Sequence, residues 1–221
     1  MQITWYGQSC FKLAGAEATI IIAPFDRSLG INPPKGRADI VMLAGTAKGG
    51  ASLPADAGFV ISGAGEYEIK GVMIEVFSQD GGPPERTVRY GRGFVSTLNI
   101  DGISVCHIGN VKKEDIDGML DKIGDVDILL IPVGGPYQIG KETVHALSAE
   151  EAVAVAGELE PRIIIPMQYK IPKLSVELAG VDKFLKAMGA GNGEPVDKLA
   201  IKKKDLPQEE TKIVVLSPNQ S

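Results

Sequence analysis

The chain has 221 residues and a formal net charge of −5, and 44% of its residues are hydrophobic. This length and hydrophobic content are enough to bury a full core, and we expect a single domain over residues 1–221. Its 28 acidic residues outnumber its 23 Lys and Arg, and this excludes a general nucleic-acid binder, which carries a basic excess. No apolar run approaches the roughly 20 residues that cross a bilayer, and the N-terminus lacks a signal-peptide pattern. With only two cysteines, we expect a cytoplasmic protein with no membrane partner.

The first half of the chain is predicted to consist of short strands. These are expected at 2–6, 18–23, 39–43 and 58–62, with a hairpin partner near Phe11 and Leu13. Apolar residues alternate from Ile69 to Val76 across Gly71, which predicts a hairpin. Two further strands, 94–100 and 103–107, flank Asp101-Gly102, the sequence signal of a type I′ turn.

In the second half, strands alternate with helices. Helices are predicted over 113–123, 148–159 and 181–188, and strands over 127–133, 162–167 and 213–216. Ser148, with Glu151 three residues later, forms a capping-box pattern. Hairpins followed by strand–helix alternation indicate two sheets packed face to face with helices outside them.

Seven motifs occur in a fixed order along the chain. They are ITWYGQSC, IIIAPF, ADIVML, GAGEYEIKGV, DGISVCHIGN, DILLIPVGG and PRIIIPMQY. Together they resemble the metallo-β-lactamase superfamily, in particular its branch of zinc-dependent hydrolases, from the N-terminus to Tyr169. The resemblance implies an α/β (α+β) fold, the four-layer αββα sandwich, with a site at one edge built from loops at strand ends.

The same resemblance implies a zinc site. The family holds zinc with a His-x-His-x-Asp-His loop after the third motif, a bridging Asp after the fifth, and a His in the last, and the metal makes hydroxide from water. In this sequence, these positions are occupied by Gly45, Ala47, Gly49, Gly50, Asn110 and Gln168. A further family His, expected around 79–82, is also missing. We therefore expect no metal and no cofactor where the family would use zinc.

The vacated positions are predicted to form an uncharged pocket whose Asn110 and Gln168 amides could hold a small polar ligand. Gln8 and Ala23 stand where the family usually has His and Asp. The residues expected beside the pocket are Gln8, Lys48, Asp80, His107, Gly134 and Gly135. Lys48 and its glycine neighbours could form an anion-binding nest, although the residue order is not that of a phosphate-binding P-loop and an ordinary loop is the preferred interpretation. Asp80 and Asp26 could hold a hard cation only weakly.

Three functions stay open at this point. The leading hypothesis is a homologue without zinc, which has a binding or structural role and no catalytic one. The alternative is a hydrolase of a phosphodiester, lactone or amide that uses a relocated site with His107 or Asp80 as base; for His107 we prefer an imidazole hydrogen-bonded in the core. The third is a scaffold from which the ligands were deliberately removed. Nothing in the sequence points to a particular oligomeric state.

Overall fold

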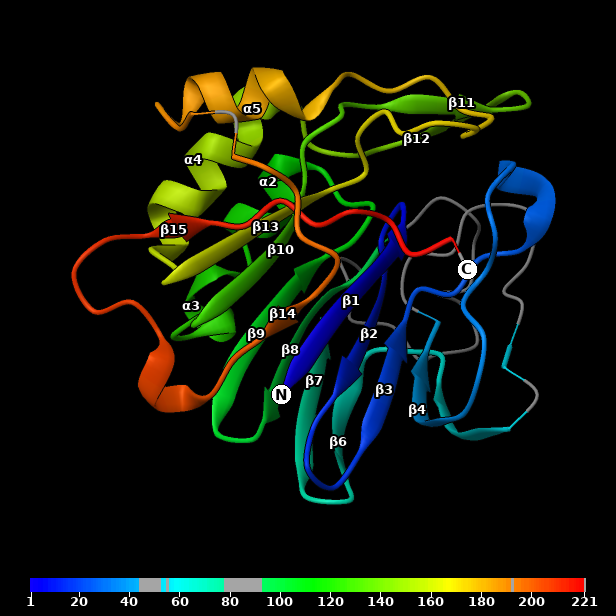
Figure 1. Cartoon of the computed structure of the whole chain (residues 1–221), viewed down its shortest axis with the longest axis vertical. Coiled ribbons are helices and arrows are strands. Elements are labelled where there is room, and N and C mark those ends of the chain that lie inside the picture. Colours follow the sequence, from blue (N-terminus) through cyan, green and yellow to red (C-terminus); the bar gives the residue numbers. More distant parts are fainter. Residues whose placement is uncertain (44–52, 55, 78–92, 192, 221) are drawn as a thin grey trace.

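Two β-sheets packed face to face form the body of the protein (Figure 1). The computed structural model describes residues 1–43, 53–54, 56–77, 93–191 and 193–220. The six-stranded sheet has the order β14-β1-β2-β3-β4-β5 and the seven-stranded sheet the order β15-β13-β10-β9-β8-β7-β6. Most buried apolar residues of both sheets belong to one hydrophobic cluster, as expected for two sheets that cover each other.

Most strand bounds agree closely with the predicted ranges, although the short strand β14 was not predicted and β15 differs from its predicted range. In the six-stranded sheet they are β14 Leu199–Ala200, β1 Gln2–Gly7, β2 Cys10–Ala14, β3 Thr19–Ile22, β4 Ala38–Met42 and β5 Ala57–Ile61. In the seven-stranded sheet they are β15 Lys212–Ile213, β13 Ile163–Met167, β10 Ile128–Pro132, β9 Ile103–Ile108, β8 Val95–Ile100, β7 Val72–Phe77 and β6 Gly65–Ile69. The continuous apolar runs of β10 and β13 are buried at every residue, which is why they pair in parallel at the centre of the layers.

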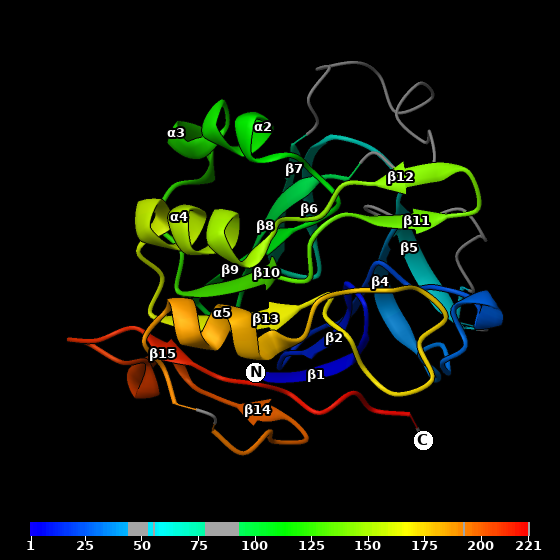
Figure 2. The same ribbon diagram turned by 90° about the horizontal axis from the view of Figure 1, so that it is seen from above.

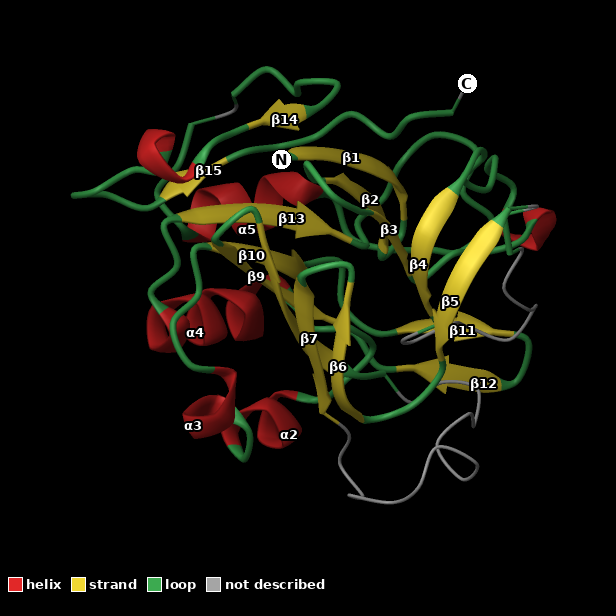
Figure 3. Ribbon diagram, turned by 90° about the horizontal axis from the view of Figure 1, so that it is seen from below, coloured by secondary structure: helices red, strands yellow, loops and turns green. Residues whose placement is uncertain are grey.

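Helices cover the outer side of the seven-stranded sheet. They are α2 Lys113–Asp117, α3 Leu120–Ile123, α4 Ala149–Leu159 and α5 Val181–Ala187, with short 3₁₀ turns η1 Arg27–Leu29 and η2 Lys203–Asp205. Figures 2 and 3 show α2, α3 and α4 on the face of this sheet turned away from the six-stranded sheet, and α5 packs on α4. The predicted α/β sandwich is confirmed.

Helix α4 and the Asp101-Gly102 turn follow their sequence signals. The Glu151 amide N–H donates to Ser148 Oγ at 3.2 Å, and the Ser148 N–H donates to Glu151 Oε2 at 2.8 Å, which completes the capping box. Asp101 and Gly102 have φ angles of 54° and 74°, as a type I′ turn requires.

Two predictions of local structure were wrong, and one hairpin was missed. The helix expected over 113–123 is two helices, because the Met119 N–H bonds the Ile116 carbonyl at 2.8 Å and interrupts the α-helical ladder beside Gly118. The strand expected over 213–216 ends at Ile213. The Val214 N–H still donates to the Ile164 carbonyl of β13, but the chain then turns away and Leu216 bridges to Val196. The hairpin of β11 Tyr137–Ile139 and β12 Glu142–Val144 was not predicted.

No helix in the described residues is long and apolar enough to cross a membrane.

Candidate functional site

The parallel strands of the seven-stranded sheet bring three predicted residues to one edge. Because β9, β10 and β13 run parallel, their carboxyl ends lie at the same side of the sheet. Asn110 follows β9 by two residues, Gly134 follows β10 by two, and Gln168 directly follows β13. Open α/β sheets generally bind ligands at this edge.

The six-stranded sheet contributes Gln8 to the same place. Strands β1 and β3 both pair antiparallel with β2, so they are parallel to each other, and β3 is parallel to β4. Gln8 follows β1 and Ala23 follows β3. The Gln168 N–H donates to the Gln8 carbonyl at 3.3 Å, and this bond joins the edges of the two sheets.

Side-chain hydrogen bonds bring Asn110 and Gln168 together. Gln168 Nε2 donates to Asn110 Oδ1 at 2.6 Å and to Ser9 Oγ at 3.2 Å. All three residues are buried, with exposed fractions of 2% for Asn110, 1% for Gln168 and 6% for Ser9. Two residues that sequence reasoning predicted at separate strand ends therefore share one hydrogen bond.

His107 is buried against Ser9 inside the sandwich. It is fully inaccessible, its Nε2 lies 2.9 Å from the Ser9 carbonyl, and its ring meets the Phe11 ring edge-on at 6.3 Å between centroids. Burial lowers the pKa of His107 to about 4, so the imidazole is neutral near pH 7 and Nε2 donates to Ser9. This agrees with the interpretation as a core histidine and leaves the relocated hydrolase site without His107 as its base.

Buried polar side chains are concentrated at this edge. Of the seven buried polar or charged residues in the described part of the chain, six belong to one connected group, which we call the polar cluster. Its members are Gln8, Ser9, Ser96, His107, Asn110 and Gln168. Ser96 joins it as the cross-strand partner of His107 in the β8–β9 ladder. Sequence reasoning did not identify Ser9, in the turn between β1 and β2, or Ser96, in β8, because a lone serine in a turn or strand carries no signal of its own.

The polar cluster contains groups that lack a hydrogen-bond partner. Within the described residues, every unpartnered buried side-chain nitrogen or oxygen belongs to it, and the five atoms are Gln8 Oε1, Gln8 Nε2, Ser96 Oγ, His107 Nδ1 and Gln168 Oε1. A buried polar group without a partner costs about 1–3 kcal/mol. Such groups are rare in proteins and call for an explanation at the site where they gather.

Three strand ends at this edge have a strained backbone. Gln8, Ala23 and Gln168 have φ angles of 49°, 48° and 50°, the left-handed region that residues other than glycine rarely adopt. Each such residue costs about 1–3 kcal/mol, and such residues cluster at functional sites. The strain falls at the positions where the resemblance places altered site residues.

The loop after β10 packs directly against Gln168. A Cβ atom on Gly134 would collide with the Gln168 carbonyl, so only glycine allows this approach. The Gly134 carbonyl accepts from the Ala179 N–H at 3.0 Å, and the Gly135 N–H donates to the Leu147 carbonyl at 2.9 Å. Gly134 thus lies directly against the backbone of Gln168, and Gly135 fastens the same loop to Leu147.

The described residues at this edge do not fit a zinc ion. Zinc is held by imidazole nitrogen, thiolate or carboxylate oxygen, whereas Asn110 and Gln168 are amides engaged with each other. No group of three or more His, Cys, Asp or Glu among the described residues could hold a metal. Both cysteines are buried, and burial raises the pKa of the Cys106 thiol to about 12.

Several other residues were weighed as part of the site. Gly45, Ala47, Lys48, Gly49, Gly50 and Asp80 lie outside the described residues. Asp26 accepts from the Ser28 N–H at 2.8 Å and caps η1. His145 is exposed.

Comparison with known proteins agrees with this architecture. A family model described as a beta-lactamase superfamily domain matches residues 2–168. A UPF0173 metal-dependent hydrolase from Methanoculleus marisnigri is 28% identical over 196 residues, which cover 76% of this chain and 81% of the relative.

Solved structures show the same fold. One comes from Thermotoga maritima and is provisionally named a Zn-dependent hydrolase of the metallo-β-lactamase superfamily. It is 30% identical with a TM-score of 0.74, and the alignment covers 97% of this chain and 98% of the Thermotoga chain. An isothiocyanate hydrolase from Delia radicum gut bacteria shares the fold at 14% identity and a TM-score of 0.63, covering 91% of this chain and 100% of its own. The chain belongs to the beta-lactamase superfamily and has the metallo-β-lactamase fold.

Proposed function

We propose that the protein binds a small, uncharged polar molecule at the polar cluster without a metal ion, as a catalytically inactive member of its superfamily. The observation that carries this proposal is the concentration of all five unpartnered buried polar atoms of the described residues in one cluster. A ligand that offers complementary donors and acceptors would offset their desolvation cost.

The charge of the cluster favours a neutral ligand. None of its six members is a Lys, Arg, Asp or Glu, and His107 is neutral because burial lowers its pKa to about 4. A charged ligand in such a low-dielectric site would need a paired opposite charge. The amide side chains of Gln8 and Gln168 instead offer neutral hydrogen-bonding groups.

Several relatives are named as metal-dependent hydrolases, and a metal would supply a hydroxide nucleophile near neutral pH. In this chain, Asn110 and Gln168 occupy two of the family's ligand positions, and their mutual hydrogen bond takes the place of metal coordination. We propose no hydrolytic step for this site.

The test measures metal content and hydrolysis on the full chain. We expect well below one zinc ion per chain by mass spectrometry of the purified protein, and no turnover of bis-p-nitrophenyl phosphate, a lactone or an anilide. One or two tightly bound zinc ions together with hydrolysis of any of these substrates would contradict the proposal.

A matched variant restores the family's ligand pattern. It carries Gly45→His, Ala47→His, Gly49→Asp, Gly50→His, Asn110→Asp and Gln168→His, which together rebuild the imidazole and carboxylate set that zinc prefers. We expect this variant to bind zinc in isothermal titration calorimetry under conditions where the natural chain shows no heat of binding. Equal zinc binding by both proteins would show that the substituted positions are not the metal site.

A further inference from the structure

Resting on the proposed function, we propose that the group recognised by the polar cluster is a primary carboxamide or a urea, a planar group with N–H donors and a carbonyl acceptor. The hydrogen bonds of Gln168 fix the orientation of its side-chain amide. Its Nε2 donates to both Asn110 Oδ1 and Ser9 Oγ, so both of its N–H groups are used. Gln168 Oε1 is buried and has no donor. Gln168 can therefore only accept a hydrogen bond from a ligand.

Gln8 supplies the complementary part. Gln8 is only 4% exposed, and both its Oε1 and its Nε2 lack a hydrogen-bond partner. Gln168 is joined to this segment twice: its backbone N–H donates to the Gln8 carbonyl, and its side chain donates to Ser9, the residue after Gln8. Together the two glutamines leave two acceptor oxygens and one donor NH₂ group without partners.

These groups match an amide better than an anion. A carboxamide can donate its two N–H groups to the two acceptor oxygens and accept from Gln8 Nε2 at its carbonyl. A carboxylate or phosphate would place negative oxygens against Gln168 Oε1, and no member of the cluster is cationic, since His107 is neutral and uses Nε2 on the Ser9 carbonyl. A site built to hydrogen-bond a specific group strongly rejects an analogue without that group, because the polar atoms of the site are then left unpaired.

The test compares isosteric probes on the full-length protein. Binding of benzamide, benzoate and benzyl alcohol is measured by ligand-observed NMR titration. We expect benzamide to bind roughly tenfold or more tightly than benzoate and benzyl alcohol. We expect Gln8→Met and Gln168→Met to lose this preference, while Gln138→Met, which replaces an exposed glutamine of β11, keeps it.

Thermal unfolding checks that each variant is folded. If Gln168→Met does not fold, Gln8→Met still decides the question, because no hydrogen bond of the Gln8 side chain is lost. Absence of benzamide binding, or equal binding of benzamide and benzoate, would overturn the carboxamide inference. If benzyl alcohol binds most tightly and Gln8→Met abolishes that binding, the inference fails while the proposed neutral-ligand function stands. Stoichiometric zinc with hydrolysis would refute the proposed function itself.

Discussion

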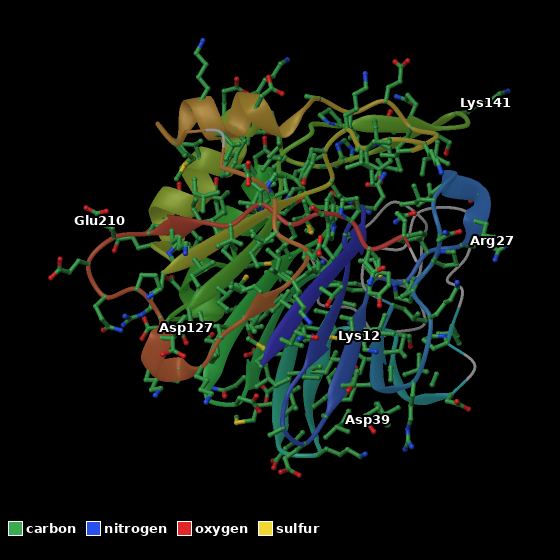
Figure 4. The ribbon with its side chains drawn as sticks, in the orientation of Figure 1. Lys12, Arg27, Asp39, Asp127, Lys141 and Glu210 are labelled. Carbon is green, nitrogen blue, oxygen red and sulfur yellow. The ribbon has the colours of Figure 1, made fainter. Side chains whose placement is uncertain are left out.

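The two ends of strands β9, β10 and β13 differ in whether their buried polar groups have hydrogen-bond partners. At the amino ends of β9, β10 and β13, Asp127 is 7% exposed and fully engaged. Its carboxylate accepts from the Ser104 N–H at 2.9 Å and Lys203 Nζ at 2.6 Å, and lies 3.4 Å from Arg162 Nε. Asp127 lies beside the η2 segment that carries Lys203 (Figure 4). At the carboxyl ends, the polar cluster holds five atoms without partners.

The difference separates a stabilising site from a binding site. Partners around Asp127 come from three segments of the chain and tie them together, so its desolvation is offset within the protein. The polar cluster leaves its desolvation cost unmet and keeps a strained backbone at Gln8 and Gln168. Local instability of this kind is kept where function requires it.

The largest expected effect is the acid sensitivity of the polar-cluster end. The pKa of His107 is about 4 in the folded chain, against 6.5 when unfolded, so between these values only the unfolded chain gains a proton. The free energy of unfolding should therefore fall as the pH falls from 6.5 to 4, by roughly 3 kcal/mol. Urea unfolding across this range should show the slope in the natural chain and in His145→Asn, and a smaller slope in His107→Phe. An equal slope in His107→Phe would assign the effect to other groups.

Removing Asp127, at the end where the buried carboxylate has all its partners, should lower the free energy of unfolding slightly less. Asp127→Ala removes the acceptor of the Ser104 N–H and the partner of Lys203, and we expect a loss of about 2–3 kcal/mol in the free energy of unfolding. Asp125 is an exposed neighbour whose backbone carbonyl, and not its side chain, accepts a hydrogen bond from Ser104 Oγ. Asp125→Ala should therefore change the free energy of unfolding by no more than about 0.5 kcal/mol. Similar losses for both would show that Asp127 does not hold this end together.

Within the polar cluster, Gln168 should behave like Asp127. Gln168→Met removes the donor to Asn110 Oδ1 and Ser9 Oγ, and we expect a destabilisation of about 1–2 kcal/mol in urea unfolding. A neutral result would mean that these two hydrogen bonds contribute nothing to the fold.

Gln8 should show the opposite sign and the smallest effect. Gln8→Met keeps the side-chain length and removes two buried atoms without partners, so we expect the ligand-free protein to gain up to about 1 kcal/mol. The gain should come with loss of ligand binding, the trade-off expected of a binding residue. Destabilisation of the same size would show that the Gln8 amide is satisfied in solution.

Local patterns predicted most of the fold. The alternation across Gly71, the Asp101-Gly102 turn and the Ser148–Glu151 capping box each depend on a few neighbouring residues, and all appear in the structure. The continuous helix over 113–123 was wrong because its apolar spacing says nothing about the break beside Gly118. The strand over 213–216 was wrong because Leu216 bridges in parallel to Val196, a partner that local sequence does not specify.

By itself, the sequence determined the succession of most strands along the chain, the superfamily resemblance and the presence of amides and glycines at the expected ligand positions. These features depend on residue identity and spacing along the chain. Only the tertiary structure decided that Gln8, Asn110 and Gln168 meet, that Ser9 links Gln168 to His107, and that His107 is buried and neutral. Those facts depend on two sheets closing over each other, which brings residues more than a hundred positions apart into one low-dielectric site.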